Sequence, residues 1–365
     1  MIAAFVLGVI GTGAIKGFAQ TLALGIVISM FTALVITRIV LNAFYALGIR
    51  DEKFYGVAKE GKNINFLSRK AVFFGISAAV ILAGAVFMGI NKVSDGEILN
   101  YSLEFKGGTS TNVTFNEDLS LEDIDSKVVP VVSDVVGGGV IQAQKVQGSN
   151  EVIIKTKTLE VAQREELNQA LADAFAVDTE KITTETISST ISSEMRSDAL
   201  LAVIVATICM LIYIWFRFKD VRFAASSVLA LVHDVLVVLA FYAIAKVSVG
   251  STFIACMLTI VGYSINATIV IFDRVRENLS LAGFKEELQT TVNKSINQTL
   301  SRSIFTSLTT FIMVAALYVL GVTSIREFAL PIMVGIVCGT YSSVCLTGAM
   351  WYVFRTKFAK KVVKK

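Results

Sequence analysis

A polar triplet, Ser264-Ile265-Asn266, interrupts an apolar segment of the chain. Polar side chains are costly in lipid, so they normally face the interior of a helix bundle or a wet pathway. The surrounding run, GYSINATIVIFDRVREN, then ends the apolar segment with ionisable and amide residues, namely Asp273, Arg274, Arg276, Glu277 and Asn278. We therefore expect this segment to belong to the working part of a membrane protein, with an ordinary basic helix end as the alternative for its last residues.

His233 and Asp234 lie inside a second apolar segment. Intramembrane carboxylates are often functional, so Asp234 is a candidate proton carrier or cation partner, and a structural hydrogen bond is the alternative. His233 either titrates near neutral pH or packs in the bundle. It is the only histidine, and the four cysteines lie in apolar segments without metal-ligand spacing. We expect no metal, no cofactor and no disulfide framework.

The composition is that of an integral membrane protein. The 365 residues are 54% hydrophobic and 17% charged, whereas soluble proteins have about 45–50% apolar and about 25% charged residues. The mean hydropathy of +0.69 agrees. The net charge of +4 comes from basic residues in short loops and gives no reason to expect a nucleic-acid partner.

Seven apolar segments are long enough to cross a bilayer of about 30 Å. They lie near 18–45, 71–91, 198–216, 222–245, 251–272, 303–320 and 327–354. Lys and Arg concentrate in 46–70, 273–302 and the tail, which strict alternation of the spans puts on one side. The positive-inside rule makes this side cytoplasmic. Residues 92–196, with twice as many acidic as basic residues, then lie outside.

Residues 97–195 are typical of a soluble α+β domain. We expect helices at 119–135 and 159–175, with strands at 98–115, 140–146, 151–157 and 181–187. This βαββαβ order predicts a ferredoxin-like layout. Gly107-Gly108 breaks the first strand region, and since no Lys-Ser/Thr follows it, a backbone bend is favoured over a phosphate cradle.

Four motifs resemble those of SecF, a protein-export membrane subunit. The run from Gly262 to Asn278 resembles GYSINDTIVVFDRIREN in the fourth SecF helix, and its last residues match the family's cytoplasmic helix end. The other matches are LVHDVL at Leu231 to Leu236, GTYSS at Gly339 to Ser343, and FKGGT, which supplies Phe105, Gly107, Gly108 and Thr109. The resemblance covers roughly residues 55–358. One position departs, because the family's aspartate after the asparagine is Ala267 here.

The resemblance bears on Arg302, which opens a later apolar span. Alone, a terminal arginine usually extends to the lipid headgroups. In the family, the aligned arginine partners the missing aspartate in a proton path. Asn266 cannot ionise, so it cannot replace that aspartate. We therefore expect Arg302 to pair either with Asp234 or with a carboxylate of a SecD half. The alternative is that the SecD half alone couples ions. The ion-path candidates are Asp234, His233, Asn266 and Arg302.

The chain also contains an internal repeat. Residues 11–37 align without a gap to 321–347, with identities at Gly11/Gly321, Gly25/Gly335 and Thr37/Thr347 among others. Transporters are often built from such repeats. The first copy resembles the end of SecD, so we expect the start of the chain to lie inside a longer SecDF-type fusion. The predicted parts are 1–45 (SecD-like helices), 46–70 (linker), 71–91 (first SecF-like helix), 92–196 (outside domain), 197–354 (five helices) and 355–365 (basic tail).

The expected fold is a multi-span α-helical membrane bundle of the SecF and resistance-nodulation-division type, with a small ferredoxin-like α+β extracytoplasmic domain. The resemblance implies an accessory subunit of Sec protein export in the bacterial cytoplasmic membrane, driven by the proton or sodium gradient. Its expected partners are the SecD half, the SecYEG channel, translocating preproteins and membrane lipids. No enzyme activity is expected, because no nucleotide-hydrolysis motif is present. The alternatives are an exporter of small molecules or lipids and a passive scaffold of the channel.

Overall fold

The computed structural model describes residues 2–10, 13–51, 54, 63–94, 96–138, 141–146, 149–218, 220–282, 287–321 and 323–362. They form two compact units. The first comprises residues 1–100, 201–248 and 252–365, and the second comprises 101–200 and 249–251. Residues 52–53 and 55–62 of the predicted linker 46–70, and 363–365 of the predicted tail, lie outside the described residues.

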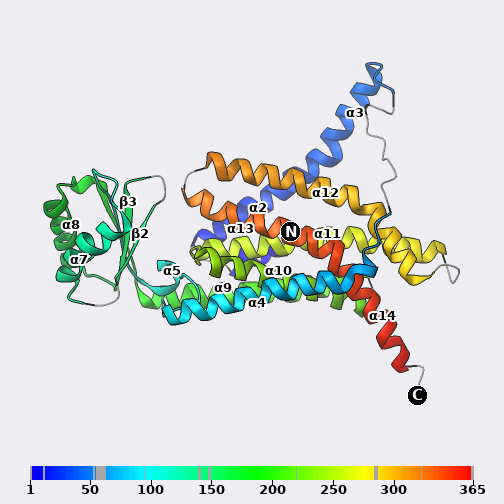
Figure 1. The fold of residues 1–365 in the computed structure, drawn as a ribbon. Coiled ribbons are helices and arrows are strands. Elements are labelled where there is room, and N and C mark those ends of the chain that lie inside the picture. The colour runs from blue at the N-terminus through cyan, green and yellow to red at the C-terminus, as the bar shows by residue number, and fades with distance from the viewer. Residues whose placement is uncertain are drawn as a thin grey trace. The chain divides into compact units, whose positions relative to one another are not determined.

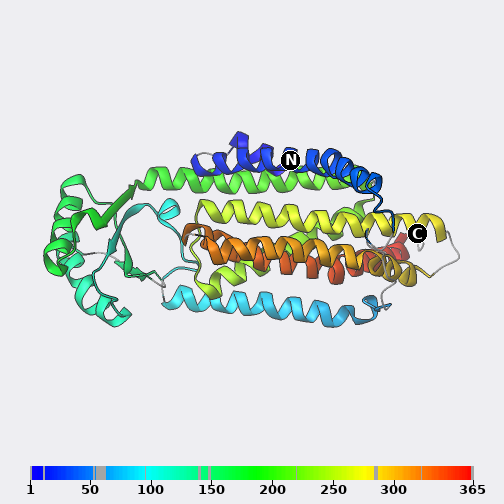
Figure 2. The same ribbon diagram turned by 90° about the horizontal axis from the view of Figure 1, so that it is seen from above.

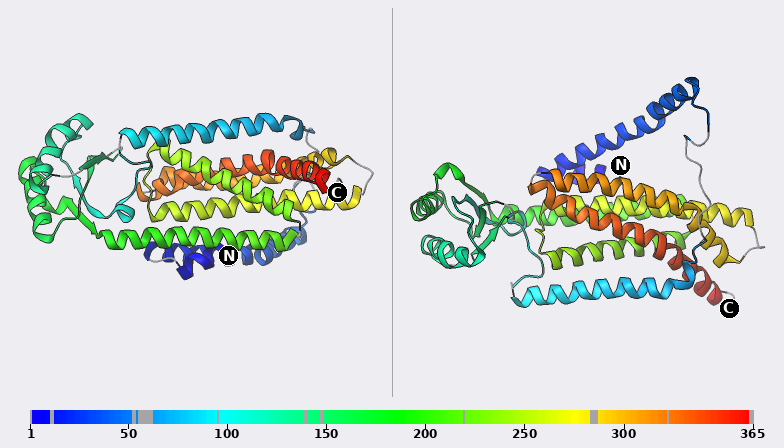
Figure 3. Two further views of the ribbon diagram at one scale, coloured as in Figure 1. Left: turned by 90° about the horizontal axis from the view of Figure 1, so that it is seen from below. Right: turned by 45° about the horizontal axis from the view of Figure 1, so that its top comes forward.

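The first unit is a bundle of long helices that lie side by side (Figure 3). Among the described residues, seven helical stretches are long and apolar enough to cross a membrane, in agreement with the seven predicted spans. The helices are α1 Ile2–Ile10, α2 Gly13–Phe31, α3 Thr37–Ala46, α4 Lys70–Ser94, α9 Ser189–Phe218, α10 Val221–Ala245, α11 Ser251–Ala282, α12 Leu288–Leu320, α13 Thr323–Tyr341 and α14 Gly348–Val362; the 3-10 turn η3 covers Leu67–Arg69.

Several helices, among them α11 and α12, extend beyond their predicted spans. α11 continues through the polar group at 273–278 to Ala282, so this group is not at the helix end. α12 begins at Leu288, so residues 288–300, an amphipathic stretch before the predicted span, are part of the same helix. Its Asn293 and Asn297, one turn apart, accept hydrogen bonds from the backbone N–H groups of Phe66 and Ile64, at 2.8 and 2.9 Å. These contacts hold the amphipathic stretch against the bundle.

The internal repeat extends to backbone detail. Both copies contain a π-helical segment at the aligned place, η1 Thr32–Ile36 and η6 Ser342–Thr347. The identical threonines stabilise both segments in the same way. Thr37 Oγ1 donates to the carbonyl of Thr32 at 3.1 Å, and Thr347 Oγ1 donates to that of Ser342 at 3.0 Å. π-Helical turns are rare and frequently lie at functional sites.

Small residues let the helices of the bundle approach closely. A Cβ at Gly84 of α4 would overlap the Cβ of Ala240 on α10, and a Cβ at Gly335 of α13 would overlap the Ile260 side chain on α11. Gly339, one turn after Gly335, faces Ser264. Glycine and alanine at four-residue spacing permit such contacts in membrane bundles. In Figure 1, α4 lies beside α10 and α12 beside α13.

The second unit is a ferredoxin-like α+β fold, as predicted. Its antiparallel sheet has the order β2-β3-β1-β4, and α7 and α8 lie on one face of it (Figures 1 and 2). Val113, Ile154, Val132 and Leu167 are among the fully buried core side chains. The elements are β1 Gly108–Thr114, α6 Leu121–Asp123, η4 Ile124–Val128, α7 Val129–Val136, β2 Gln142–Lys145, β3 Glu151–Thr156, α8 Val161–Phe175, η5 Thr179–Lys181 and β4 Ile182–Ile187.

The predicted strand before Gly107 is wrong. Residues Leu103–Lys106 form a short helical turn, α5, and Tyr101 makes an isolated bridge to Val249. The turn ends at Gly107 and Gly108, whose φ angles are +75° and +125°. A residue with a Cβ disfavours these angles. The glycine pair therefore makes the expected bend, but between a helical turn and β1.

Candidate functional site

Asp234 is the centre of a buried polar cluster in the bundle. Among the described residues it is the only buried carboxylate, and its side chain is fully buried. Its Oδ2 accepts hydrogen bonds from the hydroxyls of Ser264 and, at 2.8 Å, Ser342. Its Oδ1 lies 2.9 Å from His233 Nδ1 and accepts a bond of 3.3 Å from Cys338 Sγ. A charge buried in the bundle therefore has four polar partners.

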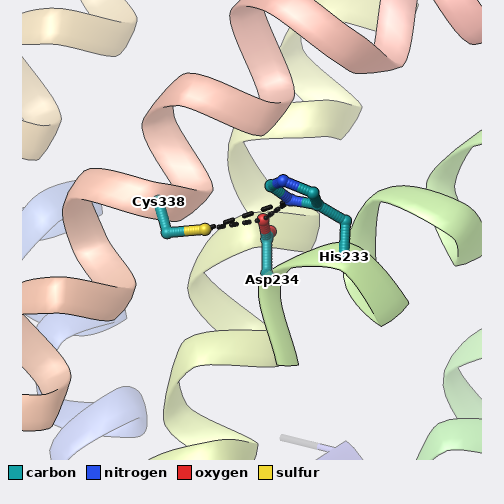
Figure 4. Close-up of side chains that lie close together, drawn as sticks. All are labelled: His233, Asp234 and Cys338. Atoms are coloured by element: carbon teal, nitrogen blue, oxygen red, sulfur yellow. Dashed lines mark hydrogen bonds and ion pairs between the residues drawn. The ribbon is translucent and has the colours of Figure 1, made fainter. Parts of the chain in front are cut away.

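Three helices contribute to this cluster. His233 and Asp234 belong to α10, Ser264 to α11 and Cys338 to α13, and Ser342 is the first residue of η6. The Gly335 and Gly339 contacts bring α13 onto α11. The close approach places two serine hydroxyls within hydrogen-bond distance of one carboxylate oxygen. Figure 4 shows the side chains of His233, Asp234 and Cys338 pointing toward one another.

The four partners match what an ionised carboxylate requires. Its two oxygens offer about four lone-pair sites and no donor. A serine hydroxyl both donates and accepts, so the cluster can retain its hydrogen bonds when Asp234 is protonated, by rotation of one hydroxyl. The geometry therefore leaves neither oxygen of the Asp234 carboxylate without a partner, which would otherwise cost about 1–3 kcal/mol.

Arg302, Asn266 and Ala267 lie together in a second place, between α11 and α12. They line a cavity of about 80 Å³, large enough for water. Tyr263 and Ser307 line the same cavity, and Tyr263 Oη donates to Ser307 Oγ at 2.6 Å. The missing family carboxylate would thus point into a cavity that Arg302 also lines.

One of the alternatives for Arg302, a pairing with Asp234, is absent from the described residues. Arg302 is exposed and lines the α11–α12 cavity, whereas Asp234 is fully buried and bonded to other groups. The reason is helix geometry. Tyr263 and Ala267 occupy one face of α11 at i and i+4, and Ser264, one residue on from Tyr263, is turned by about 100° toward α10.

The polar residues of the segment 273–278, in the last part of α11, contact one another and residues of neighbouring helices. Arg217 donates to Asp273 at 2.9 Å, with both side chains more than a third exposed, so the pair stabilises little. Arg274 contacts Glu277 at 2.7 Å, and Asn278 donates to Ser295 of α12 at 2.8 Å. Arg276 is exposed. This group joins neighbouring helices.

The FKGGT motif lies in the second unit and organises its sheet. Phe105 is buried, and a Cβ at Gly108 would overlap the carbonyl of Thr156. Thr109 is fully buried, and its hydroxyl accepts a bond of 2.9 Å from the N–H of Leu159. These contacts give the motif a structural role in the junction of β1, β3 and α8.

Sequence reasoning missed Cys338 and Ser342 as site residues. The apolar surroundings of Cys338 and its lack of metal-ligand spacing favour a packing role for it. Ser342 belongs to the GTYSS motif, which was noted for resemblance alone. The sequence contains one signal that could have found these two residues. Gly339 lies between them, and a glycine in a membrane helix allows close contact with a neighbouring helix.

The bundle and the sheet define the class of the protein: a multi-pass α-helical membrane protein with a ferredoxin-like domain. Residues 166–357 match the family model for the C-terminal part of the protein export membrane proteins SecD and SecF. The SecF protein translocase subunit of Sebaldella termitidis is 36% identical over 295 residues, which are 80% of this chain and 92% of that protein. The chain belongs to the SecD/SecF family.

Relatives in which SecD and SecF are one polypeptide also match. The SecDF protein translocase subunit of Thermus thermophilus is 34% identical over 362 residues, 98% of this chain and 47% of that protein. The crystal structure of SecDF from Thermus thermophilus, described as a translocon-associated membrane protein, matches 97% of this chain with a TM-score of 0.80 at 34% identity, and 47% of that structure is covered. The chain spans about half the length of these SecDF relatives.

Proposed function

We propose that this chain acts in protein export across the bacterial cytoplasmic membrane, as part of a SecDF-type accessory unit of the Sec translocase. The names of the SecF and SecDF relatives support this proposal. Its partners are a SecD half, the SecYEG channel and translocating preproteins. The ferredoxin-like unit faces outward in this proposal, because the acidic segment 92–196 then lies opposite the basic loops.

The observation that carries ion coupling is the enclosure of Asp234. A fully buried carboxylate among helices is costly unless it is hydrogen-bonded, and intramembrane carboxylates usually mark ion pathways. Protonation of Asp234 removes the charge that holds Ser264 of α11 and Ser342 of η6. A change in its protonation therefore changes the interaction energy between three helices, which is what coupling of an ion to helix movement requires.

The α11–α12 cavity is a second candidate on the ion path. Arg302 and Asn266 line it, but the cavity wall carries Ala267 where the family has a carboxylate. In our proposal Asp234, and not position 267, is the titrating group of this half. A passive scaffold of the channel is the competing function, and the alanine at 267 favours it.

Secretion under a controlled gradient separates the two functions. Cells that carry this protein as their sole SecDF component, together with a matching SecD half, are assayed for export of a reporter before and after collapse of the proton gradient, and separately of the sodium gradient. If an ion gradient drives this protein, its contribution to export of the reporter is lost when that gradient collapses. A contribution that survives both treatments contradicts ion coupling and supports the scaffold.

A further inference from the structure

Three atoms that commonly bind metals converge in the interior of the bundle. His233 Nδ1, Asp234 Oδ1 and Cys338 Sγ all lie within 4.8 Å of one another. The pairs are separated by 2.9 Å (Nδ1 to Oδ1), 3.3 Å (Sγ to Oδ1) and 4.0 Å (Sγ to Nδ1). Figure 4 shows the three side chains directed at one point. We propose that they form a binding site for one thiophilic divalent cation, with Zn²⁺ as the representative.

The charges of the site favour a divalent cation. Cys338 as a thiolate and Asp234 as a carboxylate carry two negative charges, and a divalent cation cancels both. All three residues are more than nine-tenths buried. A net charge is expensive in such surroundings, so a neutral ligand set is the stable one. The set of one imidazole, one thiolate and one carboxylate suits Zn²⁺, which takes N, S and O ligands.

The spacing fits such an ion with small movements. Tetrahedral zinc with ordinary bond lengths places its ligand atoms about 3.4–3.6 Å apart, which lies between the observed separations. The surrounding groups already orient the carboxylate, because Ser264 and Ser342 both bond to Oδ2. Oδ1 is thereby directed at the histidine and the cysteine. Such outer hydrogen bonds are typical of metal-binding carboxylates.

The site lies at the wall of a groove in the bundle. His233 and Cys338 also line an apolar groove of about 510 Å³ between α4, α10, α12 and α13. His233 Nε2 is buried and has no hydrogen-bond partner among the described residues. Nδ1 faces the carboxylate and carries the imidazole proton, so binding of the cation at Nδ1 moves that proton to Nε2.

Binding exchanges a proton for the metal. The Cys338 S–H bond breaks, its proton goes to solvent, and a metal–sulfur bond forms, without any oxidation or reduction. One proton is released for each ion bound. The bound ion links α10 to α13, so it fixes two helices that now meet through hydrogen bonds. A bound ion also holds the Asp234 carboxylate, so the metal-bound form is one in which the protonation of Asp234 proposed above cannot occur. The inference concerns binding alone, and its test does not use export activity.

Cobalt titration of the purified full chain in detergent tests the proposal, because Co²⁺ reports thiolate ligation by a charge-transfer absorption in the near ultraviolet. We expect one Co²⁺ per chain with this absorption, displaced by Zn²⁺. Cys338→Ser should abolish the absorption, and His233→Gln or Asp234→Asn should weaken binding by about 10- to 100-fold. Cys345→Ser, which alters a nearby intramembrane thiol of η6, is the matched control and should bind as the parent does.

A second variant keeps the test independent of whether Cys338→Ser folds. In it, Cys209, Cys256 and Cys345 are replaced by serine and Cys338 is kept, and it should retain the absorption and the stoichiometry. The proposal is overturned if the parent chain shows no thiolate absorption at saturating Co²⁺. It is equally overturned if the absorption survives Cys338→Ser, or if the variant that keeps Cys338 loses it while eluting as the parent does.

Discussion

The hydroxyl of Ser342 donates a hydrogen bond of 2.8 Å to the carboxylate of Asp234. Ser342 is the first residue of the π-helical segment η6, and its own carbonyl accepts from Thr347. A turn with altered backbone geometry thus supplies a donor to the buried charge. The aligned residue in the first copy of the repeat is Thr32, which begins η1 and is exposed. Both copies of the repeat contain the π-helical segment, but only η6 of the second copy lies next to the carboxylate of Asp234 among the described residues.

Asp234→Asn should impair export far more than Asp273→Asn. Asparagine cannot ionise, and its amide places donors where Ser264 and Ser342 already donate. We expect gradient-dependent secretion to fall by about tenfold, because ordinary coupling free energies correspond to changes of this order. Asp273 pairs with Arg217 near solvent, so its loss should change secretion little. The measurement is reporter secretion at matched protein levels, and equal effects of the two variants would favour the scaffold function.

Ala267→Asp should create an interaction with Arg302 across the α11–α12 cavity that both residues line. The new carboxylate lies next to a permanent cation, so export should become more sensitive to the proton gradient or stop in one state. Arg302→Ala should be much more damaging in the Ala267→Asp background than in the parent, because it leaves an acid without its partner. A double-mutant cycle on reporter secretion measures this coupling, and strictly additive effects would show that the two side chains do not interact.

Gly335→Ala should destabilise the bundle, whereas Gly25→Ala should not. The two glycines occupy the same position in the two copies of the repeat. A Cβ at Gly335 would overlap Ile260 of α11, while one at Gly25 meets nothing within 4 Å in this structure. Overpacking of a well-packed interior costs about 1–3 kcal/mol. Thermal unfolding of the full chain in detergent checks the pair, and equal shifts of Tm would mean that the α11–α13 contact is not so close.

The fragment 97–195 should fold by itself and unfold cooperatively on heating. It contains the whole four-stranded sheet and both covering helices, and its core is built from its own side chains. Leu167→Ala removes a fully buried side chain of this core, which should lower the free energy of unfolding by about 2–5 kcal/mol. Urea unfolding followed by circular dichroism provides both readouts. A broad, non-cooperative transition of the parent fragment would contradict the predicted boundaries.

The stability of the same fragment should fall in strong acid partly through Asp123. Lys127 and then Ser120 donate hydrogen bonds to this carboxylate, at 2.7 and 2.6 Å, and lower its pKa from 3.8 to about 2. Because the pKa is lower in the folded state, the contribution is present above pH 3.8 and is lost as the pH falls toward 2. The Tm difference between the parent and Asp123→Asn should therefore shrink over that interval. Lys127→Gln, which removes the main cause, should weaken the pH dependence; an unchanged profile would assign the acid sensitivity elsewhere.

The sequence by itself determined the class of the protein and much of its layout. Apolar length predicted the seven spans, since a bilayer demands about 20 residues per helix. Alternation and turn residues predicted the βαββαβ order, because these patterns are local. The gapless alignment of 11–37 with 321–347 identified the repeat, and the identical threonines at 37 and 347 proved to stabilise the same π-helical turn. All these features depend on neighbours along the chain.

Tertiary structure alone decided the composition of the polar sites. Cys338 reaches Asp234 because α13 packs closely on its neighbours, and no spacing in the sequence shows that contact. Arg302 was expected to have Asp234 as one possible partner, but the rotation of α11 directs Ser264 to Asp234 and Ala267 to the cavity of Arg302. Which side chains meet in a helix bundle depends on helix rotation and on the depth of contact at Gly335 and Gly339. These quantities are set by packing between segments 30 (Ser264 and Asp234) to 104 (Cys338 and Asp234) residues apart, beyond the range of any local pattern.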